Sequence, residues 1–347
     1  MSSNALGKVY LGMSGGVDSS ISAALLLRAG YDVSGIFIRT WTPEWLSCDW
    51  EEERRDAMRV AAHLGIPLST LDLSREYKEG VVDYLLDEYR RGRTPNPDVM
   101  CNKSIKFGAF LDFAMREGAD LVSTGHYARS HESRLLAGVD RSKDQSYFLW
   151  TLTQEILSHT LFPIGGYEKR EVRELARDFG IPVADKKDSQ GICFLGAVDM
   201  KDFLRHYVDV KGGDVLDMVG QVVGRHEGAI LYTLGERHGF TVRQRLPDEG
   251  AHFVVAKDIE RNTITVATKA GETAASVREI VLRDINWITS PVTGQSYGAR
   301  IRYRQPLAAC TITGKTVTFE VPQRAVTSGQ SCVVYDGDIC LGGGVII

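Results

Sequence analysis

The segment SGGVDSS at residues 14–20 carries the clearest chemistry in the chain. It lies between an apolar stretch, Lys8–Met13, that predicts a buried strand and another, Ile21–Leu27, that predicts the first turns of a helix. Two glycines there allow close backbone approach, while the helix dipole and the serine hydroxyls favour a bound anion. The Lys of the G-x-x-x-x-G-K-[ST] phosphate loop is absent. The segment predicts a phosphate-binding loop, with an ordinary glycine-rich turn as the alternative.

A second segment, RTPNPDVMCN at residues 93–102, combines two prolines with an Asp and a Cys. The prolines predict a rigid loop, with a helix starting at Asn102 or Lys103. Cys101 would then lie near a helix N-terminus, where a thiolate is favoured. Asp98 can exchange a proton with a substrate nearby. A capping Asp and an inert, buried Cys form the alternative interpretation.

A third segment, KDSQGICF at residues 187–194, begins with polar and turn-forming residues and predicts a surface loop. A Cys on such a loop, here Cys193, can be exposed and can travel to a second thiol. Cys48, near Trp45 and Trp50, is a further candidate for the same role. The three cysteines of the β-rich tail are predicted to be small buried side chains: Cys310, Cys332 and Cys340.

Two polar segments are candidates for RNA contact. GVDRSKDQSYFL at residues 138–149 mixes charged, amide and aromatic side chains, which suits phosphate contact and base-edge recognition. Arg300, Arg302 and Arg304 alternate with apolar or aromatic residues, so a strand over Ala299–Arg304 would place three guanidinium groups on one face. Such a row could follow a phosphate backbone. A solvated face is an equal alternative for both segments.

The composition describes an ordinary globular chain. Its 347 residues are 43% hydrophobic and 25% charged, which predicts two or three domains with ample core. The net charge of −4 gives no global sign of a nucleic-acid binder. No apolar run approaches a membrane span, and the start lacks the pattern of a signal peptide. The six scattered cysteines form no C-x-x-C pair and indicate neither a zinc site nor a disulfide framework, so we expect a reducing cytoplasm.

The first part of the chain alternates strands with amphipathic helices, which predicts an α/β fold with a doubly wound parallel sheet. In such sheets ligands bind at the carboxyl ends of strands, where the phosphate-binding loop would lie. The predicted strands are Val9–Met13, Val33–Ile38, Pro67–Leu71 and Leu121–Thr124. The predicted helices are Ser19–Ala29, Glu51–Leu64, Tyr77–Arg90, Lys106–Glu117 and Lys169–Phe179.

The pattern changes after residue 197. We expect a catalytic domain over residues 1–197, a small β-rich linking domain over 198–275 that begins with a helix at Asp199–Tyr207, and a C-terminal antiparallel β-barrel over 276–347. The glycine run Leu341–Val345 is interpreted as a bulged strand. The strands expected in these two parts are Gln221–Arg225, His252–Ala256, Thr263–Ala267, Ile280–Arg283, Ala299–Arg304, Thr316–Val321 and Ser331–Tyr335.

Taken in order, these motifs resemble one enzyme family. The pattern SGGxDS is similar to the pyrophosphate loop of ATP-pyrophosphatases, which activate an oxygen by adenylation. SGGVDSS, RTPNPDVMCNKSIKF, GHY at residues 125–127, KDQSYFL, KDSQGICF, RYRQ and GQSCVVYDGDICLGGG together resemble the bacterial and organellar tRNA-specific 2-thiouridylases, from Gly12 to Gly344. The resemblance implies ATP-dependent 2-thiolation of the wobble uridine in the Lys, Glu and Gln tRNAs, with release of AMP and pyrophosphate.

The resemblance also implies residue roles. Cys193 would carry a persulfide supplied by a sulfur-relay protein or cysteine desulfurase, Cys101 would act as the nucleophile that forms a transient disulfide with Cys193, and Asp98 would support acid–base steps. Mg²⁺ would accompany ATP, with no dedicated protein metal site. The residues implied for ATP are Gly12, Met13, Ser14, Gly15, Gly16, Val17, Asp18, Ser19, Ile38 and Gly125. Those implied for tRNA are Asn96, Pro97, Asp98, His126, Lys143, Asp144, Gln145, Arg302, Tyr303 and Gln330.

The chain departs from the family pattern at Ile38, where a Met is expected, and its second and third domains are compact for the family. Whether the persulfide attacks directly or Cys101 acts on released sulfide stays open. Another adenylating ATP-pyrophosphatase, such as a small-molecule ligase or a different RNA-thiolating enzyme, is the first alternative. A non-enzymatic RNA-binding protein on an inherited nucleotide fold is the second.

Overall fold

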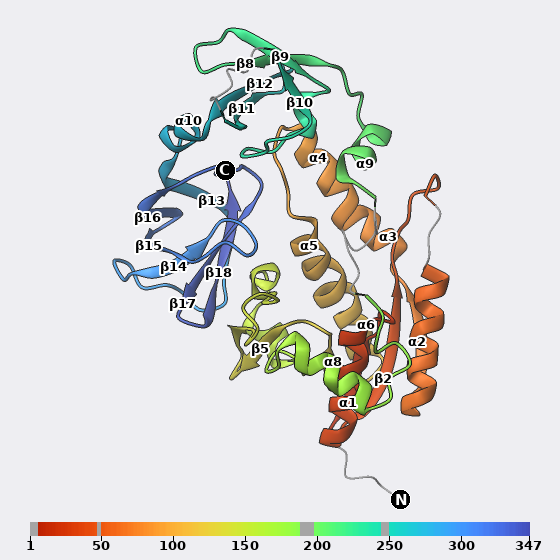
Figure 1. Ribbon diagram of the computed structural model, residues 1–347. Helices are drawn as coiled ribbons and strands as arrows, with labels where there is room; N and C mark the ends of the chain where they lie inside the picture. Colours follow the sequence, from red (N-terminus) through yellow and green to blue (C-terminus); the bar gives the residue numbers. More distant parts are fainter. Residues whose placement is uncertain (1–5, 47–49, 188–197, 244–249) are drawn as a thin grey trace, which may run out of the picture.

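The computed structural model describes residues 6–46, 50–187, 198–243 and 250–347. Its strands form three sheets, which Figure 1 shows as three bodies around a pair of long helices. The first sheet and the helices α1 (Val17–Ala29) and α2 (Trp50–Leu64) lie at the right of the view, the second sheet at the top, and the blue barrel strands at the left. The long helices, which contain α4 (Tyr84–Arg90) and α5 (Pro97–Met100), run between them.

The first sheet is parallel throughout, with strand order β3-β2-β1-β4-β7. Alternate side chains of β1 explain its two covered faces: Val9 and Leu11 pack with α1, α2 and α8, whereas Tyr10 faces Phe113 of the helix on the other side. The sheet therefore confirms the predicted α/β fold. Its strands are β1 (Lys8–Gly12), β2 (Asp32–Arg39), β3 (Leu68–Asp72), β4 (Leu121–Ser123) and β7 (Thr160–Leu161). The helices on the first face are α1 (Val17–Ala29), α2 (Trp50–Leu64) and α8 (Lys169–Asp178).

Two long helices cover the other face, and each contains a wider π-helical segment in its middle. The π segments pack closely, since a Cβ atom at Gly80 would lie 3.0 Å from Ser104 Cβ. The second helix begins at Pro97 and not at Asn102 or Lys103, so the predicted start is wrong: Pro is well suited to the first turn of a helix. The first helix comprises α3 (Ser74–Tyr77), η1 (Lys78–Asp83) and α4 (Tyr84–Arg90). The second comprises α5 (Pro97–Met100), η2 (Cys101–Ala109) and α6 (Phe110–Arg116).

A mixed sheet follows, with strand order β10-β9-β8-β12-β11. The predicted helix near its start is confirmed as α9, whose N-cap Asp199 accepts a hydrogen bond from the Lys201 backbone N–H. Phe203 and Leu204 of α9 are buried in the same cluster as the long helices, and so attach this sheet to the first one. Its elements are α9 (Met200–Tyr207), β8 (Gly213–Leu216), β9 (Val222–His226), η4 (Ala229–Leu231), β10 (Phe240–Val242), β11 (His252–Asp258), β12 (Thr263–Thr268) and α10 (Lys269–Ala274).

The third sheet is a closed barrel, because β13 pairs with β16 on one side and with β18 on the other. The glycine-rich strand β18 carries the predicted bulge: its register shifts against both β13 and β17. A hairpin from the first half of the chain, β5 and β6, pairs with β18 and extends the sheet. The strands are β5 (Ala128–His131), β6 (Arg134–Ala137), β13 (Val277–Trp287), β14 (Tyr297–Arg300), β15 (Ala308–Thr313), β16 (Thr316–Gln323), β17 (Ser331–Asp336) and β18 (Ile339–Ile346). Two short helices, η3 (Ser146–Leu149) and α7 (Gln154–Ser158), lie between the hairpin and β7 in sequence.

The expected strand over Ala299–Arg304 is wrong, and with it the row of three arginines. Strand β14 ends at Arg300, whose buried guanidinium lies 3.5 Å from an Asp144 carboxylate oxygen. Arg302 lies in the following bend and Arg304 adopts φ +63° in an exposed turn. The alternation of charged residues there reflects a strand end and a turn, so it does not create one basic face.

In the parts of the chain that the structure describes, none of the helices has the length and apolar character needed to cross a membrane.

Candidate active site

The segment at residues 14–20 forms a tight loop after the carboxyl end of β1 and continues into the first turn of α1. Its own hydroxyls hold it: Ser19 Oγ accepts from the Ser14 backbone N–H at 3.3 Å and donates to the Gly16 carbonyl at 3.1 Å. Ser20 Oγ donates to the same carbonyl at 2.7 Å. Ser14 itself is exposed, so the mouth of the loop is open to a ligand. Gly16 caps α1 with extended backbone, which directs the positive end of the helix dipole at this mouth.

Two glycines permit close approach around the loop. Gly15 has φ +71°, and a Cβ atom there would lie 2.3 Å from the Glu53 carbonyl oxygen of α2. At Gly125, after β4, a Cβ atom would lie 2.8 Å from the Ser19 backbone nitrogen. Both neighbours are backbone atoms, which cannot move aside as a flexible side chain can. The packing around the loop therefore leaves no room for a side chain at Gly15 or at Gly125.

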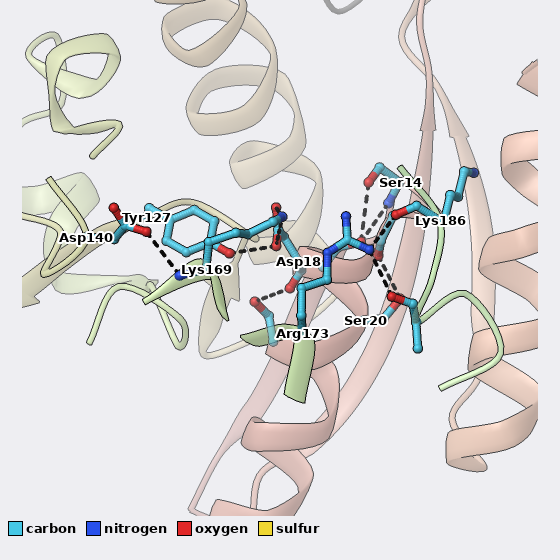
Figure 2. A network of polar contacts seen from close by, with 12 residues as sticks. Ser14, Asp18, Ser20, Tyr127, Asp140, Lys169, Arg173 and Lys186 are labelled. Atoms are coloured by element: carbon cyan, nitrogen blue, oxygen red, sulfur yellow. Dashed lines mark hydrogen bonds and ion pairs between the residues drawn. The ribbon is translucent and has the colours of Figure 1, made fainter. Parts of the chain in front are cut away.

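Asp18 is the centre of a polar network beside the loop (Figure 2). Its carboxylate accepts two hydrogen bonds from Lys169 Nζ, at 2.8 and 2.9 Å, and one from the Tyr127 hydroxyl at 2.8 Å. Lys169 is the first residue of α8, and its backbone N–H donates to Asp140 Oδ2 at 3.1 Å. The network thus joins the loop, α8 and the chain after β4 through charged groups.

A second lysine, which follows α8 in the sequence, also contacts the loop. Lys186 Nζ donates to Asp56 Oδ2 at 2.7 Å and to the Gly15 carbonyl at 3.4 Å. Arg173 holds the backbone before it, with Nη1 donating to the carbonyls of Ala184 at 2.8 Å and Lys186 at 2.5 Å. Figure 2 shows Lys186 beside the loop and Arg173 bound to the backbone that carries Lys186. Residues 184–186, directly before the KDSQGICF segment, are therefore docked on the predicted phosphate-binding loop.

The sequence reasoning missed Lys169 and Lys186. Each follows a long stretch of unrelated sequence, so spacing from the loop could not identify them. Only two weak sequence features pointed to them: Lys169 is the first residue of the expected helix Lys169–Phe179, and Lys186 directly precedes the KDSQGICF segment.

The residues predicted to bind ATP surround the loop. Gly12 lies at the end of β1, and a Cβ atom there would lie 3.8 Å both from Ile38 Cδ1 and from Phe110 of α6. Met13 and Val17 are buried beneath the loop in the core that α1 and α2 share. The close contact with Phe110 also brings the Cys101 helix to the carboxyl edge of β1.

Asp98 and Cys101 lie on successive turns of the helix that starts at Pro97. Asp98 is half-buried in the first turn, and Cys101 is 3% exposed at the start of the π segment. Cys101 therefore lies one turn inside the helix and not at its N-terminus. Cys193 and Cys48 lie outside the described residues, so the predicted Cys101–Cys193 disulfide stays a prediction.

Farther along the same helix, Lys106 Nζ lies 3.4 Å from His126 Nε2, while the Thr124 hydroxyl lies 2.7 Å from His126 Nδ1. Burial, together with the Lys106 charge, holds the pKa of His126 well below its usual value of 6.5. Since His126 follows Gly125, this contact fixes the helix against the carboxyl end of β4. His126 is buried here and does not present a free edge to a ligand.

Several residues predicted for tRNA gather around Tyr147. Asn96 hydrogen-bonds its side chain, the Tyr303 ring centroid lies 6.2 Å from its own, and the Tyr147 hydroxyl donates to the Ser331 carbonyl at 2.9 Å. Gln330, the neighbour of Ser331, turns its amide toward the loop before Asn96. One helix start and two barrel turns therefore meet at this tyrosine.

Other predicted tRNA residues bind the protein itself. Asp144 is 2% exposed and accepts from the backbone N–H groups of Gly138 at 3.0 Å and Ser146 at 3.1 Å. Gln145 Oε1 accepts from the Tyr127 N–H at 2.9 Å. Arg302 donates to the carbonyls of Leu234 and Ala325, and Lys143 is half-exposed in a turn.

The barrel cysteines are buried, as predicted. Burial raises the pKa of Cys310 to about 11 and of Cys340 to about 12, and it also raises the pKa of Cys332. These thiols are therefore inert at neutral pH. Within the described ranges, no cluster of three or more His, Cys, Asp or Glu side chains is placed to hold a metal ion.

Three protein-family models match successive parts of the chain. Residues 7–197 match the family model described as the tRNA methyl transferase HUP domain, residues 201–268 the tRNA methyl transferase PRC-barrel domain, and residues 277–346 the aminomethyltransferase beta-barrel domain. Together they describe the three sheets in order.

Curated relatives resolve the family. The chain is 46% identical to the tRNA-specific 2-thiouridylase MnmA of Nitrosomonas europaea, with 98% of each protein covered. It is 45% identical to the enzyme of that name from Listeria innocua, over 98% of this chain and 94% of the relative, and 43% identical to that of Idiomarina loihiensis, over 99% and 97%. Identity of this extent over nearly the full length outweighs the word methyltransferase in the names of the family models. The chain belongs to the tRNA-specific 2-thiouridylase family of enzymes.

Proposed function

We propose that this protein catalyses ATP-dependent 2-thiolation of the wobble uridine in the Lys, Glu and Gln tRNAs. One observation carries the proposal within its family: a phosphate-type loop and the helix bearing Asp98 and Cys101 meet at the carboxyl ends of β1 and β4, through Phe110 at Gly12 and Lys106 at His126. Parallel sheets bind ligands at this edge. The proposal therefore places nucleotide activation and sulfur chemistry side by side.

The residues at the loop suit ATP. Close backbone approach at Gly15 and Gly125, an open serine-lined mouth and a helix N-terminus all favour phosphate oxygens. Lys169 and Lys186 flank the loop, and their ammonium groups neutralise the carboxylates of Asp18 and Asp56 that would otherwise repel a phosphate. In the proposal, residues 12–19 hold the phosphates, with Ile38 and Gly125 beside the adenosine. Mg²⁺ accompanies ATP, held mainly by phosphates and water.

The proposed reaction begins by activating the base. The uridine O2 oxygen attacks the α-phosphorus of ATP, so that an O–P bond forms and pyrophosphate leaves. The adenylated oxygen is then a good leaving group. The terminal sulfur of a Cys193 persulfide attacks C2, and AMP departs with the former uridine oxygen. Asp98 exchanges protons near the base during these steps.

Release of the product requires the second thiol. The Cys101 thiolate attacks the Cys193 sulfur, the sulfur–sulfur bond to the base breaks, and the electron pair stays on the sulfur of 2-thiouridine. The resulting Cys101–Cys193 disulfide needs two electrons from a cellular reductant. In a second route, the Cys101 thiolate attacks the Cys193 sulfur of the persulfide, and hydrosulfide leaves. The hydrosulfide then attacks C2, AMP departs, and the same Cys101–Cys193 disulfide has formed. A reducing cytoplasm and a sulfur-relay protein or cysteine desulfurase fit either route.

Recognition of tRNA is proposed for the surface that includes Asn96, Pro97, Asp98, Lys143 and Tyr303. The target base has to leave the anticodon stack to reach the loop. The Phe148 and Tyr303 rings, with centroids 4.4 Å apart, offer aromatic faces near Asn96. The members of the predicted set whose side chains bind the protein itself act from behind this surface: His126, Asp144, Gln145, Arg302 and Gln330.

The test supplies ATP, Mg²⁺, a ³⁴S-labelled persulfide donor and unmodified tRNA, and measures the anticodon nucleosides by mass spectrometry. The expected result is one labelled sulfur replacing one oxygen, together with AMP and pyrophosphate. Cys101→Ser and Cys193→Ser should abolish sulfur incorporation while both substrates still bind. Cys310→Ala, which removes a buried barrel thiol, is the matched control and should retain activity.

No sulfur incorporation by the wild-type protein with a competent donor would refute the proposal. ATP cleavage without sulfur transfer would favour another adenylating ATP-pyrophosphatase, and tRNA binding without ATP cleavage would favour a non-enzymatic RNA-binding protein.

A further inference from the structure

The loop that leads into the Asp98–Cys101 helix is held by the barrel. The Thr94 backbone N–H donates to the Ser328 carbonyl at 2.9 Å. The Gln330 side-chain amide donates to the carbonyls of Thr94 at 2.9 Å and Pro95 at 3.2 Å. These partners lie more than two hundred residues away in sequence. The start of the helix is thus fixed by the third sheet.

The composition of this loop explains why an outside donor is needed. Pro95 and Pro97 have no backbone N–H, so the loop lacks donors with which to pair its own carbonyls. Thr94 and Pro95 are buried, and an unpaired buried carbonyl costs free energy. Gln330 presents both hydrogens of one amide group and satisfies two carbonyls at once.

The barrel turn that carries Gln330 is itself anchored. The Gly329 N–H donates to the Ile346 carbonyl at 2.9 Å, and the Ile346 N–H donates to the Gln330 carbonyl at 2.8 Å. Gly329 has φ +92°, and a Cβ atom there would lie 2.9 Å from the Thr94 carbonyl oxygen. The turn therefore lies directly against the loop, held by the last strand of the barrel.

A buried charge connects the same two parts. Glu88 is 3% exposed and its carboxylate accepts from Arg93 Nε and from Arg283 Nη2, each at 2.7 Å. Arg93 begins the loop, whereas Arg283 belongs to β13 of the barrel. The loop is thus fixed at its start by this ion pair and near its end by Gln330.

We propose that Gln330 is a positioning residue: by holding the carbonyls of Thr94 and Pro95, it sets where Asp98 and Cys101 stand at the carboxyl edge of the first sheet. This inference rests on the proposed function and deepens it. It differs from the role expected from the sequence, in which Gln330 touches tRNA. A residue that contacts tRNA changes affinity for tRNA, whereas one that positions the catalytic helix changes turnover once tRNA is bound.

The experiment compares Gln330→Met with Gln330→Glu. Met preserves the length of the side chain and removes the donors, whereas Glu places a carboxylate oxygen against two carbonyl oxygens. Gln295→Glu is the matched control, since Gln295 is an exposed barrel residue of the same type. Each protein is tested by single-turnover thiolation at saturating tRNA and ATP, by direct titration with each substrate, and by thermal unfolding.

The expected result is a lower single-turnover rate with unchanged dissociation constants for tRNA and ATP. Because small displacements of reacting groups cost up to about a hundredfold in rate, we expect a loss of about tenfold for Met and about a hundredfold for Glu. Gln295→Glu should match the wild-type protein. The order Glu below Met follows from repulsion between the carboxylate and the two carbonyl oxygens. A rate loss measured well below the Tm of each variant distinguishes mispositioning of the helix from general destabilisation.

Weaker tRNA binding with an unchanged saturated rate would overturn the inference in favour of a direct tRNA contact. An unchanged rate and unchanged affinity in an active enzyme would also overturn it. If the wild-type protein itself transfers no sulfur, the proposed function fails, which is a separate and recognisable outcome.

Discussion

The Tyr127 hydroxyl donates to Asp18 Oδ1 at 2.8 Å and so joins the chain after β4 to the phosphate-binding loop. Gln145 binds the backbone of Tyr127 twice: its side-chain Oε1 accepts from the Tyr127 N–H, and its backbone N–H donates to the Tyr127 carbonyl, both at 2.9 Å. Tyr127 therefore links the KDQSYFL motif to the SGGVDSS loop through hydrogen bonds to both. A displacement of one motif would move the other through this side chain.

Tyr127→Phe removes this hydrogen bond while keeping the buried ring. Because hydrogen bonds to charged groups contribute about 1.5–3 kcal/mol, we expect the dissociation constant for ATP to rise by about tenfold or more. Isothermal titration with ATP measures it, and Tyr31→Phe, at the far end of the sheet, serves as the control. Equal affinities for the two variants would contradict a role for the Tyr127–Asp18 contact in ATP binding.

Lys169→Met tests the charge beside the loop. The Lys169 side chain is 14% exposed and bonded to Asp18, whereas that of the neighbouring Arg170 is 79% exposed. Loss of a placed cation should weaken ATP binding by about tenfold, and Arg170→Met should leave it within about twofold, since exposed charges contribute little. Fluorescent-nucleotide displacement at constant ionic strength measures both. A similar loss in both variants would indicate only general surface charge.

Gly15→Ala separates packing from backbone strain. Gly15 (φ +71°) and Gly30 (φ +94°) share left-handed backbone, which costs an added side chain about 1–2 kcal/mol. A Cβ atom at Gly15 would meet the Glu53 carbonyl, whereas at Gly30 nothing lies within 4 Å. We expect Gly15→Ala to lower Tm further than Gly30→Ala and to abolish measurable ATP binding. If Gly15→Ala and Gly30→Ala have the same Tm and the same affinity for ATP, the close approach at Gly15 contributes neither to stability nor to ATP binding.

Buried His126 predicts a specific pH dependence of stability. Its pKa is lowered in the folded state, so below pH 6.5 the unfolded chain binds a proton that the folded chain does not. Stability is therefore lost as the pH falls, by up to about 1.4 kcal/mol for each pH unit below that point, and is unaffected above it. Urea unfolding of the wild type and of His126→Gln at pH 5.5 and 7.5 measures the effect, which the variant should lack. A parallel pH dependence in both would contradict the assignment.

The parallel sheet and the loop could be predicted because they depend on local patterns. Strands β1 and β2 and helix α1 follow from apolar stretches, and the loop follows from its glycines. The sequence did not reveal Lys169 or Gln330 as contacts of these motifs, because both act across long separations that periodicity does not encode. The arginine row failed for a related reason: alternation predicts a strand only if the backbone continues, and it bends after Arg300.

The hairpin β5–β6 has a consequence for how the chain can be divided and made. Leu135 and Leu136 find their sheet partners in Cys340 and Ile339, about two hundred residues later. A fragment that stops at residue 197 would therefore carry an open strand edge, ready to pair with another copy. During synthesis, the open edge of β6 stays uncovered until the last strand, β18, has been made. Fragments of this enzyme should therefore be chosen so that each keeps all the strands of its sheet, and the hairpin β5–β6 belongs with the barrel.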